Sequence, residues 1–167
     1  KKKGRIDLMR ITERIVDFTK LASEQKHRFF ETMLAFDQQI FPNSTADEIY
    51  DFVHDIDAVS VQVVHYFHQD KLIGQNIIAI LKLSLNEKPL FVVSSRAGTI
   101  AAYRKRNRAL KTAIRIAINY RIRHPTIPLW FVPTVIQPKI YTNFASRSQS
   151  FFPRKGRSMP QEYLQVL

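Results

Sequence analysis

The part of the sequence that most restricts the fold lies between residues 59 and 100, where three strand-like runs alternate with two short polar turns. Residues 59–67, 73–85 and 89–100 are rich in valine, isoleucine and aromatic residues, which favour extended backbone. Residues 68–71 fit a hairpin turn, although they lack the strongest turn dipeptide, and residues 86–88 form a second predicted turn. The pattern predicts a three-stranded meander.

Two helices are predicted before this meander. Residues 23–38 place apolar side chains at helical spacing after Ser23, a good N-cap residue. Pro42 then ends the periodicity. Thr45 and Glu48 have the spacing of a capping box, in which Glu48 reaches back to the Thr45 backbone. A short helix through residues 49–53 is expected to follow.

The elements at either end complete the predicted topology. Residues 5–18 fit a first strand, and residues 129–135 a buried strand after Pro125 and Pro128. Residues 107–122 and 139–145 are expected to be helical. The longer of the two helices should present one apolar side, made of Leu110, Ala113, Ile114, Ala117 and Ile118. The order β-α-α-β-β-β-α-β-α predicts an α/β fold with a mixed sheet.

Length and composition exclude several classes of protein. A chain of 167 residues is expected to form one domain, residues 1–167, and the lack of an initiator methionine suggests a processed chain or a piece of a longer one. Without cysteine there are no disulfides, cysteine zinc sites or thiolate catalysis. No apolar run is long enough for a membrane span, and a cytoplasmic location is expected. His65 and His68 fall on opposite faces of a strand, so no metal site is predicted.

The charge of the chain is divided unevenly. Residues 88–167 hold 15 Lys/Arg residues and a single acid, Glu162, whereas residues 1–87 hold 11 Lys/Arg and 13 Asp/Glu. A solvated surface normally mixes both signs, so a one-sided stretch indicates a polyanion nearby, unless the charge serves solubility alone. A phosphorylated cofactor, a nucleic acid and an anionic membrane surface are all compatible with it.

The segment from Phe91 to Leu110 combines an apolar strand, a basic turn and the start of an amphipathic helix. The first turn of a helix has unpaired N–H groups and the positive end of the helix dipole, and it binds anions readily. Four cations add to it here: Arg104, Lys105, Arg106 and Arg108. Arginine also binds phosphate through two parallel hydrogen bonds. We therefore expect a phosphate group at this turn.

The turn resembles the acetyl-CoA signature of the GNAT (Gcn5-related) N-acetyltransferases, Gln/Arg-x-x-Gly-x-Gly/Ala. Arg104 and Ala109 match its first and last positions, and the predicted element order over residues 5–150 is also similar. Asn107 stands where the family has glycine, and asparagine is the residue that best replaces glycine at positive φ. Ala101 stands where the family commonly has proline.

The resemblance implies an acyl-CoA-dependent acyltransferase that transfers an acetyl or longer acyl group to an amine acceptor. It places the pantetheine arm along the backbone of Thr99, Ile100 and Ala101. The pyrophosphate would lie against the turn formed by Arg104, Lys105, Arg106, Asn107, Arg108 and Ala109. Gly98 could form a bulge that parts the fourth and fifth strands.

For catalysis, the resemblance assigns protonation of the leaving thiolate to Tyr141, although packing beside Phe144 is an equal interpretation. A carboxylate base is often found near the fourth strand of the family, but residues 89–161 contain no Asp or Glu. Five acidic residues on the second predicted helix and just after it could border the acceptor pocket or form an ordinary solvated face. They are Asp47, Glu48, Asp51, Asp55 and Asp57.

Two other functions fit the sequence. The basic half of the chain could act as a nucleic-acid-binding module, with the cations of residues 96–123 along a phosphate backbone. The fold could also serve as a CoA-binding or interaction domain without catalysis. Focused charge at one helix start favours a cofactor, and a continuous stripe favours nucleic acid.

Overall fold

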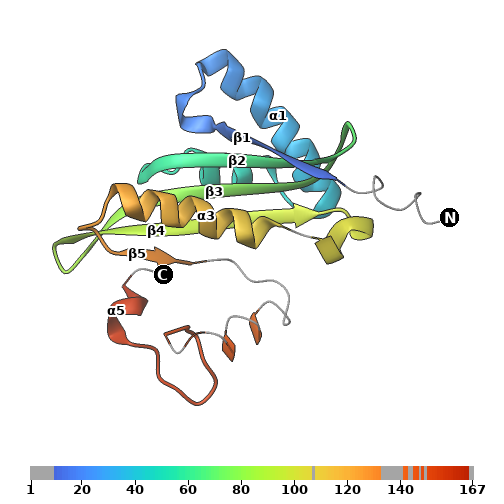
Figure 1. Cartoon of the computed structure of the whole chain (residues 1–167). Coiled ribbons are helices and arrows are strands. Elements are labelled where there is room, and N and C mark those ends of the chain that lie inside the picture. The colour runs from blue at the N-terminus through green and yellow to red at the C-terminus, as the bar shows by residue number, and fades with distance from the viewer. Residues whose placement is uncertain are drawn as a thin grey trace.

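The computed structural model describes residues 10–106, 108–132, 141–142, 145–146, 148 and 150–165. Its centre is a five-stranded sheet in the order β1-β2-β3-β4-β5 (Figure 1). The first four strands are antiparallel neighbours, and β5 runs parallel to β4. The strands are β1 (Ile11–Asp17), β2 (Ala58–His68), β3 (Lys71–Leu85), β4 (Lys88–Thr99) and β5 (Leu129–Phe131).

The meander forms as predicted, because both of its turns are tight hairpins. His68 pairs with Lys71, and Leu85 pairs with Lys88, so each loop contains two residues. In the second loop Asn86 has φ 49° and Glu87 φ 63°. Positive φ at both central residues matches the right-handed twist of the flanking strands.

Helices cover both faces of the sheet. α1 (Ser23–Ile40) and α2 (Ala46–Val53) lie on one face, and α3 (Ala109–Arg123) lies on the other (Figure 1). The α1–α2 face packs Met33 and Ile49 against the inward residues of β2 and β3. The α3 face packs Ala113 and Ala117 against its own set of strand residues. Alternation along each strand thus separates two apolar cores.

The ends of the first two helices differ in detail from the prediction. The N-cap of α1 is Ala22 instead of Ser23, and the Ala22 N–H donates to Oε1 of Gln25 at 3.2 Å. The Thr45 cap is confirmed, since its Oγ1 accepts from the Glu48 N–H at 3.2 Å. The Glu48 side chain does not return to Thr45, because its carboxylate turns toward β4.

The helix on the other face begins later than predicted, at residue 109 instead of 107. Residues 101–106 before it form a 3-10 helix. Ala113 and Ala117 of its predicted apolar side are buried, but Leu110, Ile114 and Ile118 are exposed. Polar anchors explain this rotation. Thr112 lies against the sheet beside Glu13 and brings the small alanines inward with it.

The chain beyond α3 is described only in part. The predicted strand 129–135 appears as β5, and its remainder lies outside the described residues, as does much of the predicted helix 139–145. A short helix, α5 (Gln161–Leu164), places Tyr163 against Trp130 of β5, with ring centroids 4.6 Å apart. In the described part of the chain, no helix is long and apolar enough to cross a membrane.

Candidate active site

The parallel strands β4 and β5 are paired over three residues each in the described part of the chain. This pairing covers residues 91–93 of β4 and 129–131 of β5. The Val132 N–H donates to the Val93 carbonyl at 2.8 Å and extends the pairing by one hydrogen bond. β4 itself continues to Thr99, and within the described residues its second half has only β3 as a strand neighbour.

Along the second half of β4, a row of backbone groups faces the side on which the described residues place no strand. Alternate residues of a strand point their N–H and C=O groups the same way. Because Val93 directs its backbone groups toward β5, Ser95, Ala97 and Thr99 direct theirs toward the same side. Within the described residues, the carbonyl of Thr99 accepts a long hydrogen bond from Nε of Arg104, 3.4 Å. Such an edge can accept an extended ligand that carries its own amides.

Gly98 does not form the predicted bulge, and its role is close packing. The register between β3 and β4 is continuous through the pair Gln75 and Gly98. A Cβ at Gly98 would lie 2.9 Å from Cγ2 of Ile40 at the end of α1. Glycine is therefore needed here because α1 approaches the β4 backbone closely.

Ile100 and Ala101, the next two residues predicted to contact the cofactor, lie beyond the end of β4. The Ile100 N–H donates to the Ile73 carbonyl at 3.0 Å, and its own carbonyl accepts from the Tyr103 N–H at 2.9 Å. Both backbone groups of Ile100 are thus engaged within the protein. Ala101 is exposed at the first position of the 3-10 helix. The prediction that these two residues contact a cofactor stays a prediction.

The basic turn follows directly after the end of β4. Arg104 and Lys105 are exposed on the 3-10 helix that follows β4. Asn107 and the side chain of Arg106 lie outside the described residues. Residues 101–106 form a 3-10 helix, which is tighter than an open loop. Their side chains therefore leave the backbone in several directions.

Arg108 has a structural position at the start of α3. It is the N-cap residue, and its carbonyl accepts the Thr112 N–H at 3.0 Å. Its guanidinium reaches the carbonyl of Ile11 on β1, 3.4 Å away. No side chain of the described residues caps the helix start, whose first residue is Ala109. The positive end of the α3 dipole is thus directed toward the basic turn.

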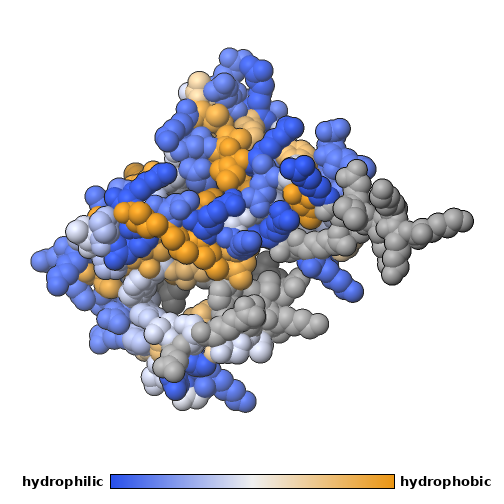
Figure 2. Space-filling model, viewed as in Figure 1, coloured by the Kyte–Doolittle hydropathy of each residue, from blue (hydrophilic) through white to orange (hydrophobic). Residues whose placement is uncertain are grey.

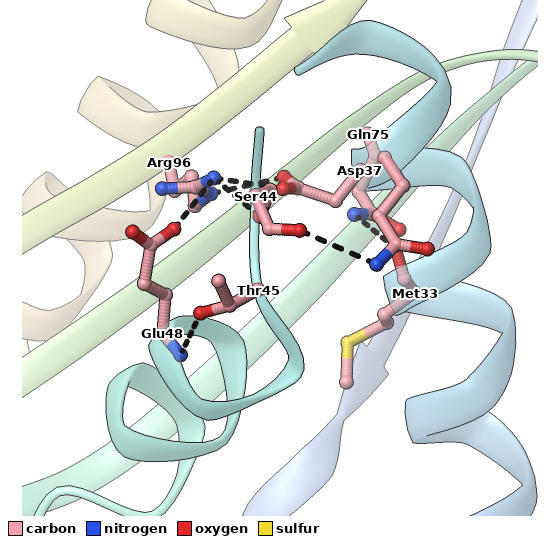
Figure 3. Close-up of polar contacts among 8 residues, drawn as sticks. Met33, Asp37, Ser44, Thr45, Glu48, Gln75 and Arg96 are labelled. Carbon is pink, nitrogen blue, oxygen red and sulfur yellow. Dashed lines mark hydrogen bonds and ion pairs between the residues drawn. The ribbon is translucent and has the colours of Figure 1, made fainter. Parts of the chain in front are cut away.

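On the opposite face of β4, an ion cluster joins the sheet to both early helices (Figure 3). Arg96 Nε and Nη2 donate to the two carboxylate oxygens of Asp37 on α1, at 2.9 and 2.8 Å. Nη2 also donates to Oγ of Ser44 at 2.9 Å and lies 3.8 Å from Oε2 of Glu48 on α2. Its guanidinium stacks on Phe41, 5.1 Å from the ring centroid.

The members of this cluster differ in their access to solvent. Asp37 is buried. Its hydrogen bonds with Arg96, together with the negative charges of Asp37 and Glu48, raise the pKa of Arg96 despite partial burial of the guanidinium. The Glu48 side chain is 55% exposed, so a molecule arriving from solvent can reach it. Arg96 belongs to the half of β4 beyond Val93. Glu48 is therefore an accessible carboxylate beside this half of β4.

This cluster was not predicted from the sequence. The basic half of the chain contains no Asp or Glu between residues 89 and 161, so it holds no partner for Arg96 nearby in the sequence. The acids come from helices that are 48 to 59 residues away along the chain from Arg96. One signal was present, since an arginine in an otherwise apolar strand requires a carboxylate partner from elsewhere.

A second buried polar group lies beneath α1. His65 Nε2 and Oε1 of Gln75 are 2.9 Å apart, and Gln75 Nε2 donates to the Met33 carbonyl at 3.1 Å. Burial lowers the pKa of His65, although the hydrogen bond with Gln75 acts in the opposite direction. His65 and His68 lie on opposite faces, and the described residues hold no group of three side chains suited to a metal.

The α3 face carries its own polar layer. Glu13 of β1 accepts from Thr112 Oγ1 at 3.2 Å and from Arg115 Nη2 at 2.7 Å. Beneath α3, the Tyr66 hydroxyl and Oδ1 of Asn76 are buried with no hydrogen-bond partner among the described residues. Burial raises the pKa of Tyr66.

Tyr141 lies in the partly described segment after β5. Its hydroxyl donates to the carbonyl of Pro153 at 2.8 Å, and its ring meets Phe151 edge to face, with centroids 5.5 Å apart. Phe144, the neighbour considered for it, lies outside the described residues. The role of Tyr141 as an acid stays a prediction.

Solved structures of similar shape include several N-acetyltransferases. Aminoglycoside N-acetyltransferase AAC(6')-Iy in complex with CoA matches with a TM-score of 0.52 and 13% identity, over 89% of this chain and 97% of that one. A second match, at 0.52 and 10%, is an aminoglycoside acetyltransferase from an uncultured soil metagenomic sample; it covers 91% and 99%. The ribosomal-protein-alanine N-acetyltransferase of Brucella melitensis biovar Abortus 2308 matches at 0.50 and 10%, over 90% and 97%.

The chain has the GNAT acetyltransferase fold. The predicted α/β fold with a mixed sheet is thereby confirmed. No protein-family model and no curated protein sequence matches the chain. At such low identity the likeness shows the fold alone, so the chemistry of the site must be argued from the residues of this chain.

Proposed function

We propose that this protein transfers an acyl group from an acyl-CoA, such as acetyl-CoA, to an amine acceptor. The observation that carries the proposal is that β4 continues for six residues beyond Val93, where the described residues place no strand on its β5 side. A basic turn and the start of α3 follow directly after this half of β4. This arrangement supplies backbone hydrogen bonds for an amide-bearing arm and positive charge for phosphates within one continuous stretch of chain.

The residues present fit such a cofactor. The outward backbone groups of Ser95, Ala97 and Thr99 would pair with the pantetheine arm. The amides at the start of α3, with Arg104 and Lys105, would bind the pyrophosphate. The predicted contacts of Ile100, Ala101, Arg106, Asn107, Arg108 and Ala109 belong to the same proposal.

The acceptor would approach from the α1–α2 face of β4. When bound, acyl-CoA supplies a thioester carbonyl; a C–N bond forms there as the C–S bond breaks. An attacking amine must lose a proton, and Glu48 is an exposed carboxylate that lies 3.8 Å from Arg96 in the second half of β4. Arg96, fixed by Asp37, would hold this carboxylate in position. Tyr141 would return a proton to the departing thiolate sulfur.

The acceptor is expected to be cationic. Asp47, Glu48 and Asp51 lie on α2, and all three are exposed. Their charge attracts amines that are protonated in solution, in contrast to the basic face across the sheet. Polyamines, aminoglycosides and lysine-containing peptides are the classes that this proposal selects.

Thiol release tests the proposal directly. Because the chain contains no cysteine, a thiol-reactive dye reports only the CoA that is formed. We expect turnover of acetyl-CoA with spermidine, kanamycin or a lysine-rich peptide. Glu48→Gln should lower kcat by about 10² or more with little change in KM for acetyl-CoA. The matched control is Asp47→Asn, which removes a neighbouring carboxylate and should leave kcat nearly unchanged.

Calorimetry separates binding from catalysis. Replacing Arg104 and Lys105 by alanine should weaken CoA binding at least about tenfold, because hydrogen bonds to charged groups contribute about 1.5–3 kcal/mol each. Lys26→Ala with Arg28→Ala, on α1, is the control of equal charge. CoA binding without turnover of any acceptor would instead support a catalytically silent CoA-binding domain. Absence of CoA binding would refute the proposal.

A further inference from the structure

The outer side of α3 carries a row of exposed apolar residues that the candidate active site does not use. Leu110, Ile114, Ile118 and Ile122 follow one another every fourth position, with exposed fractions of 36%, 41%, 53% and 70%. We refer to these four residues as the α3 outer stripe. Figure 2 shows hydrophobic side chains gathered in a band along α3. A contiguous apolar patch of this kind indicates a binding partner.

The α3 outer stripe continues into a hollow beside it. Ile114 and Ile118 line this hollow of about 470 Å³ together with Leu129, Phe131 and Phe151. The apolar surface therefore extends from the exposed ridge of α3 down to β5. A partner that covers the ridge can also insert a small apolar group at its side.

The cations of α3 surround this apolar surface, and most of them are not neutralised. Arg115 has a carboxylate partner in Glu13. For Lys111, Arg121 and Arg123 the described residues provide none. The positive charge is thus available to an outside anion, and its excess is strongest in this half of the chain.

Three partners are conceivable for a surface that is both apolar and basic. A second copy of the chain would bring the same unpaired cations together and be repelled. A nucleic acid would supply phosphates for the cations, but the isoleucines at the centre of the contact would have no apolar environment. A bilayer with anionic lipids satisfies both, since isoleucine side chains enter the acyl boundary while lysine and arginine remain among the headgroups.

We infer that the α3 outer stripe and its flanking cations bind an anionic lipid surface, with α3 lying parallel to the membrane plane. The contact is peripheral, because only a few side chains enter the bilayer. It places the α1–α2 face, on the other side of the sheet, away from the lipid and open to an acceptor. The inference does not depend on acyl transfer.

Vesicle co-sedimentation tests this binding. The full chain is mixed with vesicles of phosphatidylcholine alone, or of phosphatidylcholine with phosphatidylglycerol, at low and at physiological salt. We expect binding only to the anionic vesicles, weakened by salt. Ile118→Ser with Ile122→Ser should lower the affinity by about tenfold or more, because each buried isoleucine contributes a factor of that order. These residues are exposed, so the variant should keep the wild-type unfolding midpoint.

Ile56→Ser is the matched control, since Ile56 is 97% exposed on the opposite side of the sheet, between α2 and β2. It should bind vesicles like the wild type. The inference is overturned if anionic vesicles are not bound at low salt, or if the Ile118 and Ile122 variant binds as well as the wild type. Equal loss in the Ile56 control, or binding of an RNA oligonucleotide in place of vesicles, would overturn it as well.

Discussion

The two faces of the sheet are joined to their helices by ion pairs of opposite polarity. On the α1–α2 face the helix provides the carboxylate, Asp37, and the sheet provides Arg96. On the α3 face the sheet provides the carboxylate, Glu13, and the helix provides Arg115. The first pair is largely buried, whereas half of the Arg115 side chain is open to solvent.

This difference follows from the division of charge along the chain. Each pair joins a carboxylate from before residue 88 to an arginine from after it. The two halves of the sequence neutralise each other where they meet, beneath α1 and beside β1. Among the described residues, Asp47 and Asp51 of α2 and Lys111, Arg121 and Arg123 of α3 have no ion-pair partner, so these two helices on opposite faces of the sheet carry opposite charge.

The largest expected effect tests the buried pair. Asp37→Ala should lower the free energy of unfolding by about 3 kcal/mol, because it leaves a partly buried guanidinium without its carboxylate. Urea denaturation measures this loss. Asp37→Leu combined with Arg96→Met should recover most of it, since an apolar pair of similar size replaces both charges. A loss below about 1 kcal/mol in the single variant would mean that this face is no more dependent on its ion pair than the other.

Close packing on the same face should have the next largest effect. Gly98→Ala places a Cβ 2.9 Å from Ile40 and should cost about 2 kcal/mol of unfolding free energy through overpacking. In a background with Ile40→Ala the same change should cost much less, because the crowded carbon atoms are gone. Additive losses in the double variant would contradict this packing argument.

The exposed pair on the α3 face should matter less. Glu13→Gln weakens the hydrogen bonds to Thr112 and Arg115 and should lower the free energy of unfolding by about 1 kcal/mol, as solvent screens the half-exposed arginine. Chemical denaturation in low and high salt measures the loss. Should Glu13→Gln cost as much as Asp37→Ala, the contrast between the two faces would fail.

His65 should give the α1–α2 face a modest pH dependence. Burial lowers its pKa in the folded protein below the ordinary value of 6.5, so the unfolded chain takes up a proton first as the pH falls. Stability is complete above about pH 6.5 and decreases below it, by at most about 1.4 kcal/mol per unit of pKa shift. His65→Gln should remove this part of the slope when unfolding is compared at pH 7.5 and 5.5, each about one unit from the ordinary pKa. Identical slopes would exclude the effect.

The smallest effect is expected on the outer side of α3. Ile118→Ser should change the free energy of unfolding by less than about 0.5 kcal/mol, since the side chain is half exposed. Thermal unfolding measures this directly. A loss above 1 kcal/mol would show that the stripe supports the fold, in contrast to the binding role inferred for it.

The regular elements could be predicted because their signals are local. The strand character of β2 to β4, the positions of the two turns between them and the Thr45 cap each depend on residues a few positions apart. The start of α3 was misplaced by two residues, since helical periodicity does not show where a 3-10 turn ends. The bulge at Gly98 was wrong because the requirement for glycine came from Ile40, far away in the sequence.

The sequence alone determined the order of elements, the hairpins and the division of charge, because these depend on neighbouring residues and on composition. The tertiary structure decided which charges meet. It brought Glu48 and Asp37 to Arg96, turned Ile118 outward instead of inward, and placed β5 parallel to β4 at residues 91–93. These features depend on how helices dock on a sheet, and docking minimises the free energy of many distant contacts together, so no local pattern encodes it.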